Sequence, residues 1–164
     1  KDNYEINIPW EKKHFCLFIS QNYLNANKEK LVNELATLGP VNHISSFSVL
    51  LKDKSCYNSK ELIKVFGFFK FIICCENSNC TGYVTEKIFN ILLSNSIPIY
   101  DGAPEIDRYF NKKRFFKYDN NLIENVKKIM NDEKEYNKVI NTPAINENYD
   151  DENFIEVFKS HLKR

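Results

Sequence analysis

The sequence predicts one α/β domain: a Rossmann-like parallel sheet flanked by helices. Two observations predict it. Short apolar runs typical of strands alternate along the chain with stretches of helical periodicity. The run FKFIICC at 69–75 is apolar almost throughout, as expected of a strand buried on both faces of a parallel sheet. The chain has 164 residues, 43% of them apolar, which suffices for one domain with a core and excludes a disordered chain.

The first half of the chain supplies two strand–helix pairs. FCLFIS at 15–20 predicts a buried strand. A helix follows from about Lys28, because its apolar residues recur at helical spacing and Gly39-Pro40 would stop it. A second strand is predicted at 41–50, then a polar loop and a short helix at 60–67. The apolar stripe of the first helix consists of Leu31, Val32, Leu35 and Leu38.

The second half continues the alternation after the strand at 69–75. A helix is predicted at 83–95, with an apolar stripe that includes Ile88 and Leu92. Pro104 suits the first position of another helix, 104–110. The remaining predicted strands are 97–100 and 114–118, and the remaining helices are 120–130, 132–141 and 152–163. The segment 1–14 has no clear period, so we expect it to be a linker or the remnant of an upstream segment, with the domain at 15–164.

Composition excludes several classes of function. The net charge is +1 and no basic block occurs, so we expect no nucleic-acid partner. No segment approaches the ~20 apolar residues of a membrane helix, and no signal peptide is evident. The four glycines cannot form a dinucleotide fingerprint or a P-loop. The five cysteines lack metal-ligand spacing, so we expect no metal site, free thiols and a cytoplasmic location.

The segment 71–102 is the strongest candidate for a site. A buried strand runs into a polar loop and then into a helix, and ligands of open parallel sheets bind beyond such strand ends. The helix N-terminus favours an anion there. At 100° per residue, Tyr83, Glu86, Lys87 and Asn90 share the face opposite the apolar stripe. A lysine beside a carboxylate suits a nucleoside diphosphate, and a plain solvated helix face is the alternative.

These residues also resemble a known family. Glu76-Asn77-Ser78-Asn79-Cys80, then Tyr83-Val84-Thr85-Glu86-Lys87, then Ile97-Pro98-Ile99 and Gly102, resemble the signature of the α1,3/4-fucosyltransferases, glycosyltransferase family 10. The resemblance implies the C-terminal, GDP-fucose-binding half of a GT-B enzyme with two Rossmann-like domains. It extends weakly over 15–35 and 114–143.

The resemblance implies a role for each matched residue. Asn77 and Tyr83 would line the nucleotide-sugar site. Glu86 would accept from the ribose hydroxyls, and Lys87 would hold a diphosphate oxygen. The family's arginine at the start of the first helix falls at Lys28, which keeps the charge without the bidentate fork.

The resemblance also implies what to expect beyond this segment. The family's catalytic base belongs to an N-terminal, acceptor-binding domain, so the catalytic residue is unknown here. The isolated domain would be inactive without that acceptor-binding half, and a glycan acceptor would bind through a missing or separate domain. The family's donor site works without a metal, so GDP-fucose would be the ligand and no cofactor is expected.

The alternatives for function are a non-catalytic nucleotide-sugar or glycan-binding module and a transferase that uses another nucleotide sugar. If the chain is a fragment of a membrane-anchored enzyme, its expected location is the Golgi lumen instead of the cytoplasm. The final helix at 152–163 is expected to dock on the sheet, with peripheral membrane contact as the alternative.

Overall fold

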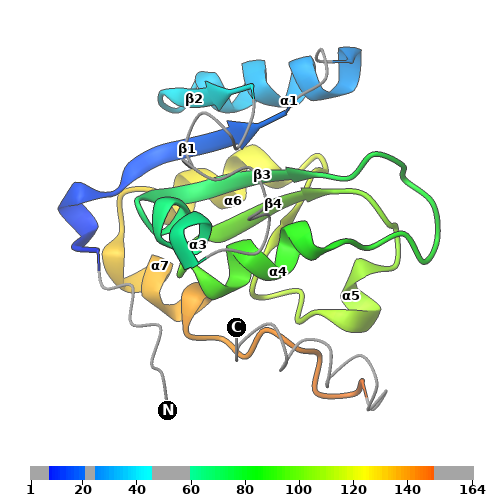
Figure 1. The fold of residues 1–164 in the computed structure, drawn as a ribbon. Helices are drawn as coiled ribbons and strands as arrows, with labels where there is room; N and C mark the ends of the chain where they lie inside the picture. Colours follow the sequence, from blue (N-terminus) through cyan, green and yellow to red (C-terminus); the bar gives the residue numbers. More distant parts are fainter. Residues whose placement is uncertain (1–7, 21–24, 46–59, 150–164) are drawn as a thin grey trace.

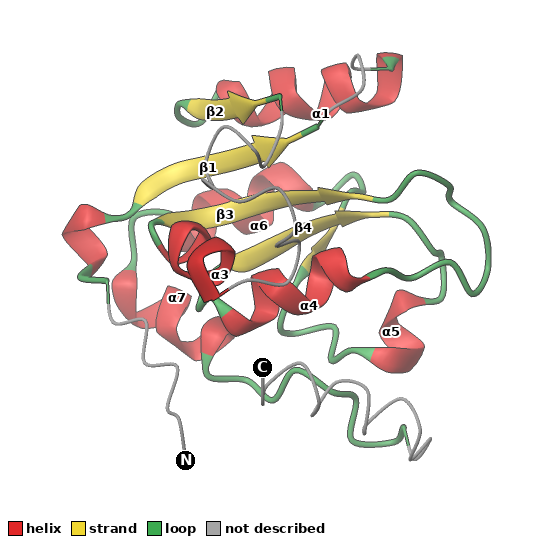
Figure 2. Ribbon diagram, in the orientation of Figure 1, coloured by secondary structure: helices red, strands yellow, loops and turns green. Residues whose placement is uncertain are grey.

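The computed structural model describes residues 8–20, 25–45 and 60–149, which form a five-stranded parallel sheet between two layers of helices (Figures 1 and 2). The strands are β1 (His14–Ile19), β2 (Val41–Ile44), β3 (Phe69–Cys75), β4 (Ile97–Asp101) and β5 (Phe116–Lys117). Their order is β2-β1-β3-β4-β5, and every neighbouring pair is parallel. The predicted fold class is confirmed.

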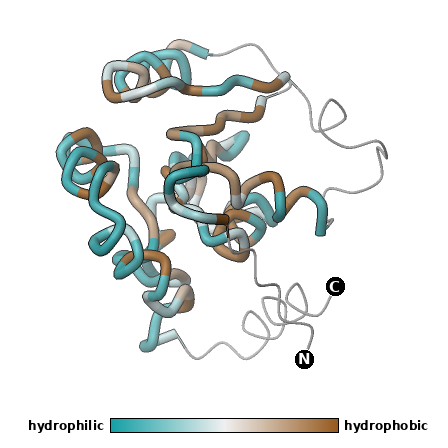
Figure 3. Tube along the Cα trace, turned by 90° about the vertical axis from the view of Figure 1, so that its left-hand side faces the viewer, coloured by the Kyte–Doolittle hydropathy of each residue, from teal (hydrophilic) through white to brown (hydrophobic). Residues whose placement is uncertain are grey.

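Each face of the sheet has its own helices because side chains alternate along each strand. Helices α3 (Lys60–Gly67), α4 (Glu86–Leu93) and α5 (Ile106–Tyr109) cover the face that carries Leu17 and Ile72. Helices α1 (Ala26–Ala36), α6 (Leu122–Ile129) and α7 (Glu133–Ile140) cover the face that carries Phe18 and Phe71. Figure 3 shows hydrophobic colour on the strands in the interior.

The N-terminal part of the described chain packs against α7. Trp10, in a short 3₁₀ turn (Trp10–Lys12), lies with its ring centroid 4.9 Å from that of Tyr136. The Lys70 ammonium lies over the Trp10 ring, 3.7 Å from its centroid. The Lys13 ammonium donates to the carbonyls of Gly67 and Asn95. These contacts involve part of the segment expected to be a linker, and the domain boundary itself stays a prediction.

Several predicted elements have different ends. Strand β2 ends at Ile44, and most of the rest of the predicted 41–50 lies outside the described residues. Helix α5 begins at Ile106 rather than Pro104, because residues 103–105 form turns instead. Strand β5 starts at Phe116 rather than at 114, since Arg114 is buried and donates to the carbonyls of Leu92 and Ser96. The predicted helix at 152–163 lies outside the described residues.

The predicted helix at 83–95 is the correction that matters most for the site. Helix α4 begins only at Glu86, with Thr85 as its N-cap, and Tyr83 lies in the preceding loop. Asn90 is 4% exposed, so it does not share a solvated face with Glu86. The expected four-residue helix face is therefore wrong for Tyr83 and for Asn90. The helix also ends early, because Asn95 takes a positive φ of 56°.

Candidate functional site

The candidate site lies at the carboxyl edge of the sheet, between β1 and β3. The strand order reverses there, which is where open α/β sheets bind ligands. The loop after β3 leads to the N-terminus of α4, and Lys28 lies in the first turn of α1, which follows β1. Asn25 caps α1 by accepting from the Lys28 N–H at 2.9 Å. Two helix N-termini therefore point to the same edge of the sheet (Figure 1).

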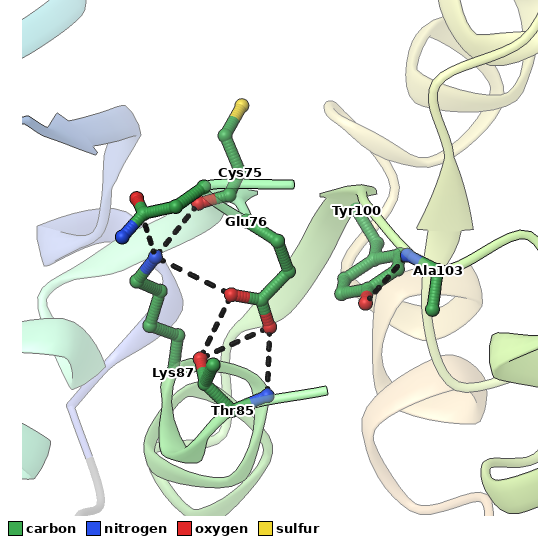
Figure 4. A network of polar contacts seen from close by, with 7 residues as sticks. Cys75, Glu76, Thr85, Lys87, Tyr100 and Ala103 are labelled. Carbon is green, nitrogen blue, oxygen red and sulfur yellow. Dashed lines mark hydrogen bonds and ion pairs between the residues drawn. The ribbon is translucent and has the colours of Figure 1, made fainter. Parts of the chain in front are cut away.

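Glu76 is the first residue after β3, and its side chain has 0% exposed area. Its Oε1 accepts from the Thr85 N–H at 2.9 Å, and its Oε2 accepts from the Thr85 hydroxyl at 2.8 Å. Figure 4 shows this carboxylate between Thr85 and Lys87. The Thr85 hydroxyl therefore serves Glu76 and makes no capping bond to α4. The N–H groups of the first turn of α4 are left to face the edge of the sheet.

Lys87 is held by three oxygen atoms. Its Nζ lies 3.3 Å from Glu76 Oε2, 3.1 Å from the Cys75 carbonyl and 3.4 Å from Asn77 Oδ1. The Lys87 side chain remains 32% exposed while its carboxylate partner is fully buried. The ammonium therefore lies at the boundary between the protein interior and the site.

The loop between β3 and α4 is tied to the loop after β4. The Asn79 amide donates to Asp101 Oδ1 at 2.9 Å, and the Gly82 N–H donates to Glu105 Oε1. Gly82 adopts a φ of 80°, a conformation that glycine takes without strain. The second oxygen of Glu105 is buried and has no hydrogen-bond partner among the described residues. The two loops thus form one wall of the site.

The charges at this edge of the sheet change the pKa of the Cys75 thiol. Burial, and after it the Asp101 carboxylate, raise its pKa to about 12. The charges of Lys28 and Lys87 both oppose that rise in pKa. Two cations thus act on the end of β3 from different helices, as an anion-binding edge requires.

A cavity of ≈ 100 Å³ lies beneath the site, between the sheet and helices α3 and α4. Its wall is mostly apolar, with Glu86, Lys87 and Asn90 as its polar members. The apolar lining includes Ile19, Leu62, Phe66, Ile72 and Ile91.

The structure brings the predicted residues to one edge of the sheet, in different settings. Asn77 and Glu86 are exposed, Tyr83 is 38% exposed, and Lys28 is partly buried. Glu76, Thr85 and Gly102 were quoted for the resemblance and given no role there. The sequence does show that Glu76 is an acidic residue directly after a buried strand, which is a position typical of a site. Its contact with Thr85, nine residues later, produces no periodic pattern that could predict it.

Two further findings concern what this part of the chain contains. Over the described ranges, no helix is both long enough and apolar enough to span a membrane. Within the same ranges, no cluster of three His, Cys, Asp or Glu side chains is arranged to hold a metal ion.

Comparison with known proteins identifies the family. The model for "Glycosyltransferase family 10 (fucosyltransferase) C-term" matches residues 8–141. Over 104 residues the chain is 33% identical to the alpha-(1,3)-fucosyltransferase FucT of Helicobacter pylori, which covers 63% of this chain and 21% of that protein. Over 56 residues it is 36% identical to the GDP-fucose protein O-fucosyltransferase 3 of Danio rerio, which covers 34% of this chain and 12% of that protein.

A solved structure agrees with this match. The crystal structure of an alpha1,3-fucosyltransferase with GDP-fucose superposes with a TM-score of 0.67 at 25% identity, over 96% of this chain and 49% of that one. The chain thus spans about half of that structure. The sheet order and these matches agree, and the chain belongs to glycosyltransferase family 10, the fucosyltransferases, as its C-terminal Rossmann-like domain.

Proposed function

We propose that this domain binds GDP-fucose as the donor half of an inverting, α1,3-type fucosyltransferase. The observation that carries the proposal is the position of Lys87, the last residue of the YVTEK signature, at the switch point of the sheet, where the charge of a second cation, Lys28, also reaches the end of β3. The family match and the solved relative titled with GDP-fucose support the choice of donor.

Each site residue receives one role in this proposal. Lys87 donates to a diphosphate oxygen, and Lys28 adds positive charge from α1. Both offset the negative charge that develops on GDP as the bond to fucose breaks, which is the usual way such a step is stabilised. Glu86 accepts from the ribose hydroxyls, while Asn77 and Tyr83 line the sugar-nucleotide path. With two lysines on the diphosphate, donor binding needs no metal ion.

The acceptor and the base are assigned to a separate domain. An inverting transfer needs a base on the side of the sugar opposite GDP. Glu76 is buried and fully hydrogen-bonded, and Glu86 lies on the donor side, so neither suits that role. The chain alone is therefore proposed to hydrolyse donor slowly at most.

Free buried thiols at Cys16, Cys74 and Cys75 support the proposed cytoplasmic location.

Calorimetry with GDP and UDP in EDTA tests this function. We expect heat of binding with GDP and weaker binding of UDP. The absence of both heat and thermal shift with millimolar GDP would overturn the proposal, and preference for UDP would point to another nucleotide sugar. The same preparation is then incubated with GDP-fucose and a panel of glycans. Fucosylated product at ~1 s⁻¹, an ordinary enzyme rate, would show that a complete active site lies within this chain.

A further inference from the structure

Glu76 has no role in the proposed function, yet it is the most buried acidic side chain at the site edge. We propose that Glu76 is a positioning residue of the donor site, which holds the Lys87 ammonium in place and fixes the start of α4 through Thr85. The inference rests on the proposed function, because it assumes that Lys87 meets the diphosphate.

The first argument is the use of both carboxylate oxygens. Oε1 accepts from the Thr85 N–H at 2.9 Å, and Oε2 accepts from Lys87 Nζ at 3.3 Å. The Thr85 hydroxyl lies 3.0 Å from one oxygen and 2.8 Å from the other. Burying a carboxylate costs much free energy unless it is paired with a cation and hydrogen-bonded. Glu76 thus joins the end of β3 to the start of α4 through a single side chain.

The second argument is the arrangement around Lys87. An ammonium has three N–H donors, and three oxygens surround Nζ in this structure. The contact with Asn77 Oδ1 is the longest, at 3.4 Å, and it comes from an exposed residue. A phosphate oxygen replaces that contact most readily. Glu76 and the Cys75 carbonyl then keep hold of Nζ, and the freed N–H is aimed at the ligand.

The third argument is the close packing on the other side of Glu76. A Cβ on Gly102 would lie 2.7 Å from Glu76 Cγ and 2.5 Å from the Tyr100 hydroxyl oxygen. The Tyr100 hydroxyl is itself fixed, because it accepts from the Ala103 N–H at 3.1 Å. Figure 4 shows Tyr100 and Ala103 on the side of Glu76 away from Lys87. Packing on this side therefore leaves the Glu76 carboxylate pointing toward Thr85 and Lys87.

The test compares the affinities of GDP and guanosine in the Glu76→Gln variant. Gln keeps the shape, but it cannot serve both Thr85 and Lys87 as an acceptor. Hydrogen bonds to charged groups justify an expected loss of about tenfold in GDP affinity. Guanosine has no phosphate and should bind as it does to the parent. GDP affinity equal to or above the parent's, or an equal loss for guanosine, overturns the positioning role.

Two more variants keep the test decisive. Thr85→Val removes the hydroxyl that touches both oxygens of Glu76, and it should weaken GDP several-fold if Glu76 positions Lys87. If Glu76→Gln does not fold, unchanged GDP affinity in Thr85→Val overturns the inference. Glu124→Gln, which breaks the exposed pair with Lys128 on α6, is the matched control and should change nothing. Failure of the parent chain to bind GDP would refute the proposed function instead.

Discussion

Lys87 neutralises a buried carboxylate as well as facing the site. A lysine on a solvated helix face could be removed without loss of stability, but removal here leaves Glu76 buried without its cation. Loss of one partner of a fully buried pair costs about 3–5 kcal/mol. Lys87 is 32% exposed, so we expect a smaller loss, about 1–3 kcal/mol, in the free energy of unfolding of Lys87→Met. GDP affinity should fall tenfold or more.

A double variant separates the two effects of Lys87. In Lys87→Met with Glu76→Gln both charges of this pair are gone, so urea unfolding should show that part of the lost stability returns, while calorimetry should show no recovery of GDP binding. A double variant less stable than the single one would contradict the charge argument. Glu86→Gln is the neighbouring control: the residue is exposed, so its stability should equal the parent's.

The close approach of the β4–α5 loop to Glu76 gives a second prediction. Gly102→Ala places a methyl group against Glu76 Cγ and the Tyr100 hydroxyl, so the carboxylate must shift. We expect a stability loss of about 1–3 kcal/mol from overpacking and weaker GDP binding, although Gly102 itself makes no proposed ligand contact. Thermal unfolding and calorimetry measure the two effects.

Gly39→Ala is the matched control for Gly102→Ala. Its added Cβ would lie 2.8 Å from the Phe15 ring, in the turn between α1 and β2. The cost in stability should be similar, but GDP should bind as to the parent. Equal losses of GDP affinity in both variants would show that general destabilisation, rather than displacement of Glu76, weakens binding.

The sequence predicted elements best where the pattern is local. The run at 69–75 coincides with β3, and Glu86 and Lys87 do begin a helix at the edge of the sheet. Its start was placed three residues early, because Val84 continues the apolar spacing while Glu76 takes up the Thr85 N–H. The start of β5 and the role of Glu76 depend on contacts between distant segments, which periodicity does not encode.

The buried thiols predict a lower free energy of unfolding in alkali. Burial raises the pKa of Cys16, Cys74 and Cys75, the last to about 12, from an ordinary value of 9.0. Above pH 9 the unfolded chain releases these protons and the folded chain keeps them. The contribution of these thiols to the free energy of unfolding is therefore fully present below pH 9. It falls as pH rises above 9, by about 1.4 kcal/mol per pH unit for each thiol. Urea unfolding between pH 7.5 and ~10.5 measures the slope.

Lys13 opposes this trend. Burial lowers its pKa to about 8 from 10.5, so the unfolded chain holds the extra proton between those values and stability rises with pH there. Burial also lowers the pKa of Lys70, which acts in the same direction as Lys13, whereas it raises the pKa of Tyr100 and Tyr136, which adds to the fall near pH ~10. The three thiols and two tyrosines together leave a net fall above pH 9. Cys16→Ala should reduce that slope by one proton. A slope in Cys16→Ala identical to the parent's would contradict the assignment.

The strand order also shapes how the chain emerges from a ribosome. β1 pairs with β2 on one side, and its other neighbour, β3, is synthesised only after α1, β2 and α3. At ~5–20 residues per second, translation from Ile19 to Cys75 takes about 3–11 seconds. Throughout that interval one apolar edge of β1 has no native partner, and such edges invite pairing with other chains. The nascent protein is thus more vulnerable to aggregation before β3 is complete than after it.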